Sequence, residues 1–155
     1  MPFYCRKPTR IPDFDYASQH YYFVTVCTKD KKCIFGTPKT LNSLGKIAWQ
    51  EFMTLDSHYE GVRVDNFVIM PNHVHGIIEI VKIDGRRTDL NNILGAYKAG
   101  VTRKIHALQP DLNVWQRSFH DHVIRNQAEY EKIWNYVTYN AQKWESDCFY
   151  PRITD

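Results

Sequence analysis

The chain has 155 residues, a net charge of +3, and 43% hydrophobic and 14% aromatic residues. This length and composition suit one globular domain with a buried core, and they exclude a disordered tail or two full-sized domains. The small net charge does not by itself indicate a nucleic-acid partner. We therefore expect a single domain over residues 1–155, with residues 1–18 as a basic N-terminal arm.

The four cysteines form neither a C-x-x-C pair nor a pattern with zinc-ligand spacing: Cys5, Cys27, Cys33 and Cys148. The N-terminus is polar and basic and is not followed by the apolar core of a signal peptide. No apolar run has the length that a membrane span requires. The sequence thus predicts a cytoplasmic protein with free thiols and no membrane partner.

Residues 20–28 are rich in aromatic and β-branched side chains and predict the first strand. A helix capped by Asn42 or Ser43 is expected next, running to about Leu55. Residues 62–70 and 73–81 then predict two strands, which Pro71-Asn72 joins in a tight antiparallel connection.

A second helix is expected from the helical spacing of apolar residues between Leu90 and Leu108, and Pro110 ends it. Residues 114–124 predict a fourth strand, and a third helix should run from Asn126 to about Trp144. The order βαββαβ plus a final helix predicts an α+β fold of the ferredoxin-like (RRM-like) type, with an antiparallel sheet and two helices on one face. Many functions use this fold, so the order does not define the chemistry.

Two histidines, His73 and His75, stand one residue apart in the strand predicted over residues 73–81. Successive side chains of a strand point to opposite faces, so both imidazoles should lie on one face, about 7 Å apart along the backbone. Such a pair can bind one divalent cation. An isolated H-x-H pair is, however, more often incidental than metal-binding.

Helical geometry distinguishes the tyrosines of the last predicted helix. At about 100° per residue, one stripe should face the core, namely Tyr130, Trp134, Val137, Ala141 and Trp144. Tyr139 should face solvent, whereas Tyr136 lies on the flank with Asn140 one turn further on. A phenol there could act as a nucleophile if a cation neutralises the phosphate that it attacks, with Asn140 as a possible third ligand.

Several basic side chains could neutralise phosphates, and one indole could stack on an unpaired base. The basic candidates are Arg6, Lys7, Lys98, Arg103 and Arg117, and the indole is that of Trp115. The alternative for the lysines and arginines is a solvated surface. For Trp115 the alternative is an aromatic in the core or at a strand edge.

The segment Pro71-Asn72-His73-Val74-His75-Gly76 resembles the HUH motif (His, bulky hydrophobe, His) of the single-tyrosine HUH transposases, most of all the REP-associated tyrosine transposases. The likeness covers most of the chain in the family's order. Residues 22–28 resemble the family's first strand and residues 94–102 its second-helix segment. Residues 115–125 resemble the block before the catalytic helix, and residues 136–140 the nucleophile segment.

This resemblance implies that Tyr136 attacks a phosphodiester of single-stranded DNA, leaving a 5′-phosphotyrosine link and a free 3′-hydroxyl. It implies that His73, His75 and Asn140 hold Mg²⁺ or Mn²⁺ against that phosphate, although these ligands would also accept zinc. The expected substrate contains hairpins or palindromes. The family usually has proline after the asparagine, where this chain has Ala141, so the helix is free to continue.

Two other functions remain open from the sequence. One is a domesticated hairpin DNA-binding protein that has the same fold and no chemistry. The other is a small metal-dependent hydrolase with water as the nucleophile, which is disfavoured because no carboxylate or further histidine accompanies the H-x-H strand as a general base. Whether the chain acts as a monomer or a homodimer is also left open.

Overall fold

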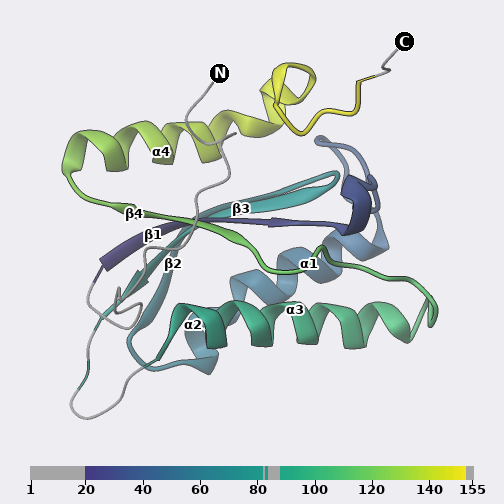
Figure 1. Ribbon diagram of the computed structural model, residues 1–155, viewed down its shortest axis with the longest axis horizontal. Helices are drawn as coiled ribbons and strands as arrows, with labels where there is room; N and C mark the ends of the chain where they lie inside the picture. The colour runs from purple at the N-terminus through teal and green to yellow at the C-terminus, as the bar shows by residue number, and fades with distance from the viewer. Residues whose placement is uncertain (1–19, 82, 84–87, 153–155) are drawn as a thin grey trace.

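The computed structural model describes residues 20–81, 83 and 88–152 (Figure 1). The strands are β1 (His20–Cys27), β2 (Val62–Met70), β3 (His73–Ile80) and β4 (His120–Ile124). The α-helices are α1 (Ser43–Met53), α2 (Leu55–His58), α3 (Leu90–His106) and α4 (Gln127–Tyr139). Two 3₁₀ helices complete the described elements: η2 (Lys29–Lys31) and η3 (Asn140–Ser146).

The sheet has the strand order β2-β3-β1-β4, and every neighbouring pair is antiparallel. This is the predicted ferredoxin-like α+β arrangement. Helices α1 and α3 cover one face of the sheet, while α4 and η3 lie over the other (Figure 1). The two central strands, β1 and β3, are therefore buried on both faces, and β3 carries the two histidines.

The main core lies between the sheet and the α1–α3 layer. Tyr97 of α3 is buried there, and its hydroxyl donates a hydrogen bond to the Ala48 carbonyl of α1 at 2.9 Å. Gly76 of β3 lets α1 approach closely, because a Cβ at this position would lie 2.4 Å from the ring of Phe52. The glycine that follows the two histidines thus serves the core on the opposite face.

A smaller apolar cluster lies under α4 and comprises Phe23, Ile77, Ile124, Ile133 and Val137. Val137 is buried as predicted, but the predicted stripe is wrong at Trp134, which is 38% exposed. The buried stripe is rotated, because Ile133 instead packs with Phe23 and Ile77. The stripe also does not extend to Trp144, because α4 ends at Tyr139 and the chain continues as a 3₁₀ helix. Tyr139 is exposed, as expected.

Two further expectations need correction. The fourth strand begins at His120, later than predicted, because Ser118 adopts a left-handed backbone with φ of 68°; before it, Trp115 makes only an isolated bridge to Thr28. Cys27 and Cys33 are thiols that form no disulfide, whereas Cys148 is disulfide-bonded. Among the described residues, none of the helices combines the length and the apolar character that crossing a membrane would require.

Candidate metal centre and nucleophile

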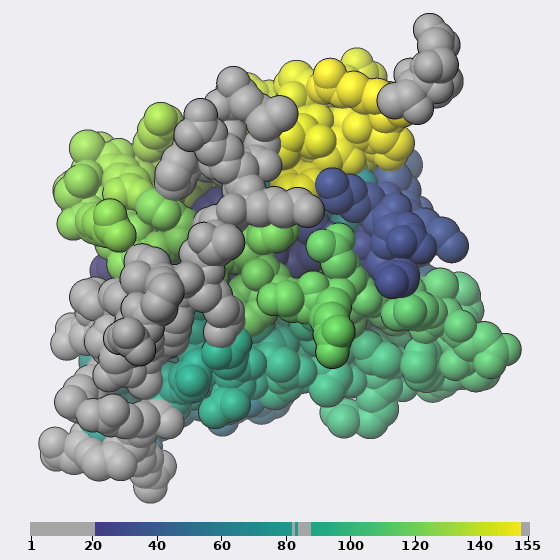
Figure 2. Space-filling model, viewed as in Figure 1, coloured from purple at the N-terminus to yellow at the C-terminus, as the bar shows by residue number. Residues whose placement is uncertain are grey.

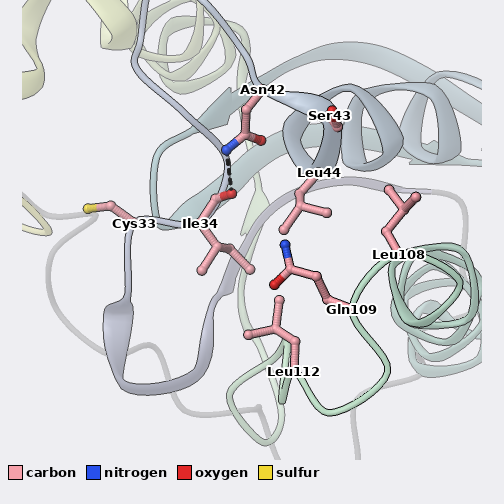
Figure 3. A pocket seen from close by; sticks show the side chains of 8 residues that line it. All are labelled: Cys33, Ile34, Asn42, Ser43, Leu44, Leu108, Gln109 and Leu112. Atoms are coloured by element: carbon pink, nitrogen blue, oxygen red, sulfur yellow. Dashed lines mark hydrogen bonds between the residues drawn. The ribbon is translucent and has the colours of Figure 1, made fainter.

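One surface hollow lies between residues 33–34, the start of α1 and the end of α3 (Figure 3). Its volume is about 480 Å³, and the Asn42 side chain at its edge donates to the Ile34 carbonyl. The described lining offers amides, a hydroxyl, aliphatic groups and the Cys33 thiol, but no imidazole or carboxylate. The groups that can bind a metal gather elsewhere, beneath η3.

His73 and His75 lie on the face of β3 that α4 and η3 cover, as the alternation of the strand predicts. Both side chains are fully buried, and their ring centroids are 4.5 Å apart. The rigid central position of β3, paired with β1 and β2 along its length, fixes the backbone of both residues. The two imidazoles are therefore held as one preformed pair.

Each imidazole is oriented through its Nδ1 atom. His73 Nδ1 lies 2.7 Å from Asn72 Oδ1, and His75 Nδ1 lies 2.8 Å from Thr25 Oγ1. An amide oxygen only accepts, so Nδ1 of His73 carries the proton and its Nε2 keeps a lone pair. A hydrogen bond at one ring nitrogen that leaves the other for the ion is the usual arrangement of metal-ligating histidine.

Both imidazoles are neutral at physiological pH, which is the form that ligates a metal. Burial lowers the pKa of His75 to about 3, although a hydrogen bond with the backbone of Val24 opposes this. Burial and then the neighbouring His75 lower the pKa of His73 well below its usual value. The side chain of Asn140 acts on His73 in the opposite direction.

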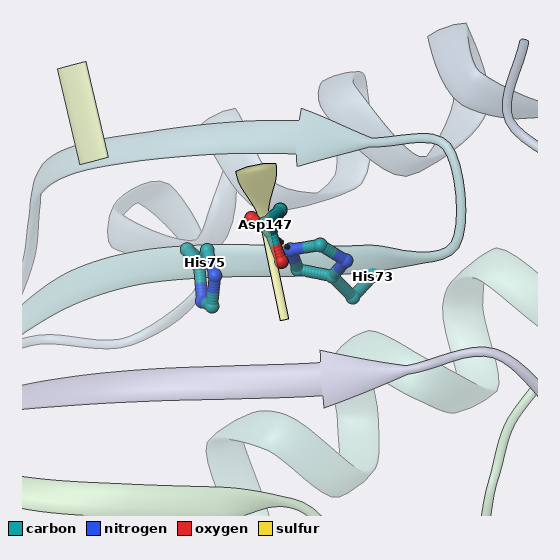
Figure 4. A group of neighbouring side chains, drawn as sticks. All are labelled: His73, His75 and Asp147. Atoms are coloured by element: carbon teal, nitrogen blue, oxygen red, sulfur yellow. Dashed lines mark ion pairs between the residues drawn. The ribbon is translucent and has the colours of Figure 1, made fainter. Parts of the chain in front are cut away.

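The structure adds a carboxylate that the sequence reasoning missed. Asp147 follows η3, and its Oδ2 lies 3.9 Å from His73 Nε2. Ligand atoms of His73, His75 and Asp147 all lie within 4.8 Å of one another, so this buried cluster can hold a metal ion (Figure 4). Nothing local marks Asp147 as a ligand, because its Oδ1 accepts from the Phe149 amide in an ordinary turn.

Asn140 lies at the same cluster. Its Nδ2 donates to Asp147 Oδ2 at 2.9 Å, and its Oδ1 is buried with no hydrogen-bond partner among the described residues. The same holds for His73 Nε2. Buried lone pairs without a partner are rare and cost free energy. A cation between the two imidazoles, the amide oxygen and the carboxylate would satisfy them, so the donor set fits a divalent ion.

Tyr136 of α4 lies next to the cluster. Its hydroxyl is 3.4 Å from His75 Nε2, and its half-buried ring packs on His75 and Phe23. The helix is tied to β2 by Asn66, whose Nδ2 donates to Thr138 Oγ1 at 2.9 Å and to the Trp134 carbonyl at 3.2 Å. The phenol oxygen and the ring nitrogen that would face a metal are thus direct neighbours.

The C-terminal segment, residues 140–152, closes the cluster on the side away from the sheet. The Phe149 ring lies 4.5 Å from the His73 ring, and the Trp144 ring lies 6.0 Å from it. Both imidazoles are fully buried and therefore do not reach the surface of the protein.

Two of the residues predicted to contact DNA make structural contacts within the chain, and their contact with DNA stays a prediction. Trp115 is 9% exposed, and its ring packs against Phe35 and Tyr97 in the core. Its Nε1 donates to the Lys98 carbonyl at 3.1 Å. The Lys98 ammonium in turn donates to the carbonyls of Gln116 (2.8 Å) and Ser118 (2.9 Å), so it holds the segment before β4 in place.

The other predicted DNA contacts also stay predictions. Arg103 near the end of α3 and Arg117 before β4 are exposed and could reach a phosphate. Arg6 and Lys7, with the rest of the predicted arm, lie outside the described residues.

Comparison with solved structures shows which proteins share the fold of this chain. It resembles the structure of a REP-associated tyrosine transposase bound to a REP hairpin, with a TM-score of 0.61 and 16% identity over 87% of this chain and 73% of that one. It also resembles the crystal structure of a presumed transposase of Deinococcus radiodurans R1, with a TM-score of 0.54 and 14% identity over 84% of this chain and 95% of that one. The chain therefore has the fold of the tyrosine transposases, as the sequence resemblance implied.

A sequence relative has also been found. A protein of Haemophilus influenzae, described as an uncharacterized protein, is 35% identical over 167 residues, which span 94% of this chain and 93% of that protein. The chain belongs to the same family as this protein. No protein-family model matches the chain. The solved structures show the fold, and the His-His-Asp cluster that can hold a metal ion lies within it.

We expect Asn72→Ala to weaken the binding of Mn²⁺ by roughly 10- to 100-fold, because partners that orient a ligand matter almost as much as the ligand. The fully buried Asn72 amide accepts from His73 through Oδ1 and donates through Nδ2 to the carbonyls of Lys31 and Phe149. Isothermal titration with Mn²⁺ measures the affinity. Asn42→Ala, which removes the N-cap of α1, is the control. An unchanged affinity in Asn72→Ala would contradict this role.

The buried imidazoles should also make the metal-free protein sensitive to acid. Below the unfolded-state pKa of about 6.5 the unfolded chain binds protons, whereas folded His75 stays neutral until about pH 3. The contribution of neutral His75 to the free energy of unfolding is therefore fully present above about pH 6.5. Below that pH the free energy of unfolding falls with a slope approaching about 1.4 kcal/mol per pH unit. Urea unfolding in EDTA at about pH 7 and about pH 5 measures this loss.

Burial raises the pKa of Asp147, so the folded protein takes up this proton more readily than the unfolded chain. Protonation of Asp147 therefore increases the free energy of unfolding as the pH falls, which opposes the effect of His75. The relevant comparison is therefore with His75→Gln, which should lose less stability between the two pH values than the wild type. The exposed His58 provides the control variant, His58→Gln, which should behave like the wild type. Equal acid sensitivity in His75→Gln and the wild type would refute the assignment.

Proposed function

We propose that this chain is a metal-dependent endonuclease and strand transferase of single-stranded DNA, with Tyr136 as its nucleophile. The observation that carries the proposal is the 3.4 Å separation between the Tyr136 hydroxyl and Nε2 of His75. A phenol has a pKa near 10 and is a weak nucleophile unless a positive charge lies beside it. Here the phenol adjoins the cluster of His73, His75 and Asp147, which could hold a metal ion.

In the proposed reaction the Tyr136 oxygen attacks the phosphorus and the bond from phosphorus to the 3′-oxygen breaks. The phenol proton passes to solvent, and the leaving oxygen takes up a proton to become a free 3′-hydroxyl. The 5′-phosphate stays linked to Tyr136, and the same 3′-hydroxyl or another one can attack it to rejoin a strand. Because the energy of the phosphodiester is kept in the link, no further energy source is needed.

His73 and His75 would hold the cation, with Asn140 as the predicted third ligand and Asp147 as a further oxygen donor. The cation would polarise the phosphate and lower the pKa of the attacking phenol. We propose Mg²⁺ or Mn²⁺, since the carboxylate and the substrate phosphate both supply the hard oxygen ligands that these ions prefer. The donor set is also compatible with zinc.

For the substrate we propose single-stranded DNA that carries hairpins or palindromes. The structural relative that is bound to a REP hairpin supports this choice. The alternative, a hairpin DNA-binding protein without catalytic activity, would bind the same DNA, and replacing Tyr136 would not change its binding. The hydrolase rival gains a carboxylate in Asp147, but that group lies among the proposed metal ligands, and both of its oxygens already accept hydrogen bonds, from Asn140 and Phe149.

The test is covalent capture. The full chain is incubated with labelled hairpin oligonucleotides that have single-stranded flanks, in Mg²⁺, in Mn²⁺ and in EDTA. We expect a protein–DNA adduct that survives denaturation, forms only with metal, and yields a phosphotyrosyl peptide of residues around position 136. A retarded complex without an adduct would favour the binding protein. Repeated cleavage without an adduct would favour the hydrolase.

A further inference from the structure

A basic loop directly follows β1 beside the candidate metal centre. This lysine loop, residues 29–32, carries Lys29, Lys31 and Lys32, and all three side chains are exposed. Within the part of the chain that the structure describes, no carboxylate forms an ion pair with any of them. Even Asp30, inside the loop, makes no such pair there. Three ammonium groups therefore lie close together in sequence, and no described carboxylate pairs with them.

The backbone of the lysine loop is held in an unfavourable shape. Asp30 and Lys31 both have φ of 54°, a left-handed conformation that costs free energy for residues other than glycine. Buried groups hold it: Thr28 Oγ1 donates to the Lys32 carbonyl at 2.8 Å, and Asn72 Nδ2 donates to the Lys31 carbonyl at 3.1 Å. Strain of this kind persists where the surroundings impose it, and it is concentrated at functional sites.

The same contacts connect the lysine loop with the metal centre. The Asn72 amide that holds Lys31 also accepts from His73, so one side chain sets both positions. The Lys31 ammonium lies 5.2 Å from the centre of the Phe149 ring, which in turn lies against His73. In the space-filling view the blue surface that contains this loop borders the yellow C-terminal segment that covers the centre (Figure 2).

We propose that Lys29, Lys31 and Lys32 bind the backbone phosphates of single-stranded DNA that flank the scissile phosphate. This inference rests on the proposed function, because it assumes that a strand enters the centre. A single strand presents one phosphate per nucleotide, and flexible ammonium groups suit such point charges without reading the bases. The loop would thus position any strand, whatever its sequence.

Salt-dependent binding tests this role. Fluorescence anisotropy in EDTA measures the affinity of the full chain for a labelled hairpin with single-stranded flanks, between about 50 and 200 mM salt. Each phosphate contact to a single strand contributes about 0.7 to the slope of log affinity against log salt. Replacing the three lysines by alanine should therefore lower the slope by about 2, and replacing them by arginine should preserve it.

The matched control changes three exposed lysines on helices, Lys46→Ala, Lys104→Ala and Lys132→Ala, and so removes the same charge. Its slope should stay at the wild-type value, and circular dichroism should show that every variant is folded. An unchanged slope in the alanine variant of the loop would overturn the proposal. An equal loss of slope in the control would do so as well, because it would show a general charge effect.

The outcome can be separated from that of the proposed function. If the alanine variant of the lysine loop shows the expected decrease in the slope of log affinity against log salt but the wild-type chain never forms an adduct, the phosphate contact stands and the nuclease proposal fails. If the adduct forms and the slope is unchanged, only the lysine-loop proposal fails. If the chain does not bind single-stranded DNA at all, both fail.

Discussion

Replacement of Tyr136 by phenylalanine should abolish the covalent adduct, because it removes the nucleophile. The rate of strand cleavage should fall by about 10³-fold or more. The substitution deletes one oxygen and leaves the ring contacts with His75 and Phe23 in place. Folding and hairpin binding should therefore stay at the wild-type level. Denaturing electrophoresis of the labelled hairpin measures the adduct, and anisotropy measures the binding.

Tyr139→Phe is the matched control, because Tyr139 lies on the same helix and is 46% exposed. This variant should form the adduct at the wild-type rate. An adduct that persists in Tyr136→Phe would remove Tyr136 as the nucleophile. An adduct that is lost only in Tyr139→Phe would move the role to the exposed tyrosine, and the position of α4 over His75 would then need another explanation.

The second large effect is expected from the histidines. His73→Ala or His75→Ala should reduce Mn²⁺ affinity by more than about 100-fold, since even partners that only orient a ligand contribute 10- to 100-fold. Metal-dependent cleavage should be lost with the affinity. Electron paramagnetic resonance of free Mn²⁺ measures the binding, and single-turnover cleavage measures the activity. His58→Ala, an exposed histidine at the end of α2, should change neither.

The oxygen ligands can be separated in the same assay. Asp147→Asn keeps the shape of the side chain and removes the buried negative charge, so it should weaken Mn²⁺ binding if the carboxylate faces the ion. Asn140→Ala removes the amide oxygen and also frees Asp147 Oδ2. Full Mn²⁺ affinity in both variants would show that neither side chain is a ligand and that the two histidines bind the ion with water or phosphate alone.

Most of the fold could be predicted because the relevant signals are local. The aromatic and β-branched residues of β1, the turn at Pro71-Asn72 and the Asn42 cap each act over a few residues, and the structure has them where they were expected. The pairing of β2 with β3 follows from the short connection, and β1 then occupies the centre as the ferredoxin-like order requires. Packing between distant elements was harder to predict. Trp134 and Ile133 are adjacent, and only the shape of the sheet beneath α4 selects Ile133.

The sequence by itself determined that the two histidines share one face of a strand, because the side-chain period of a strand is two wherever the strand lies. It also determined that Tyr136 and Asn140 are one helical turn apart. Only the tertiary structure decided what meets these groups, because η3 folds back over β3 and brings Asp147 to His73 from far along the chain. The tertiary structure likewise decided that Trp115 is buried and that the Lys98 ammonium donates to backbone carbonyls. Burial and hydrogen bonding of this kind depend on neighbours that no local sequence pattern encodes.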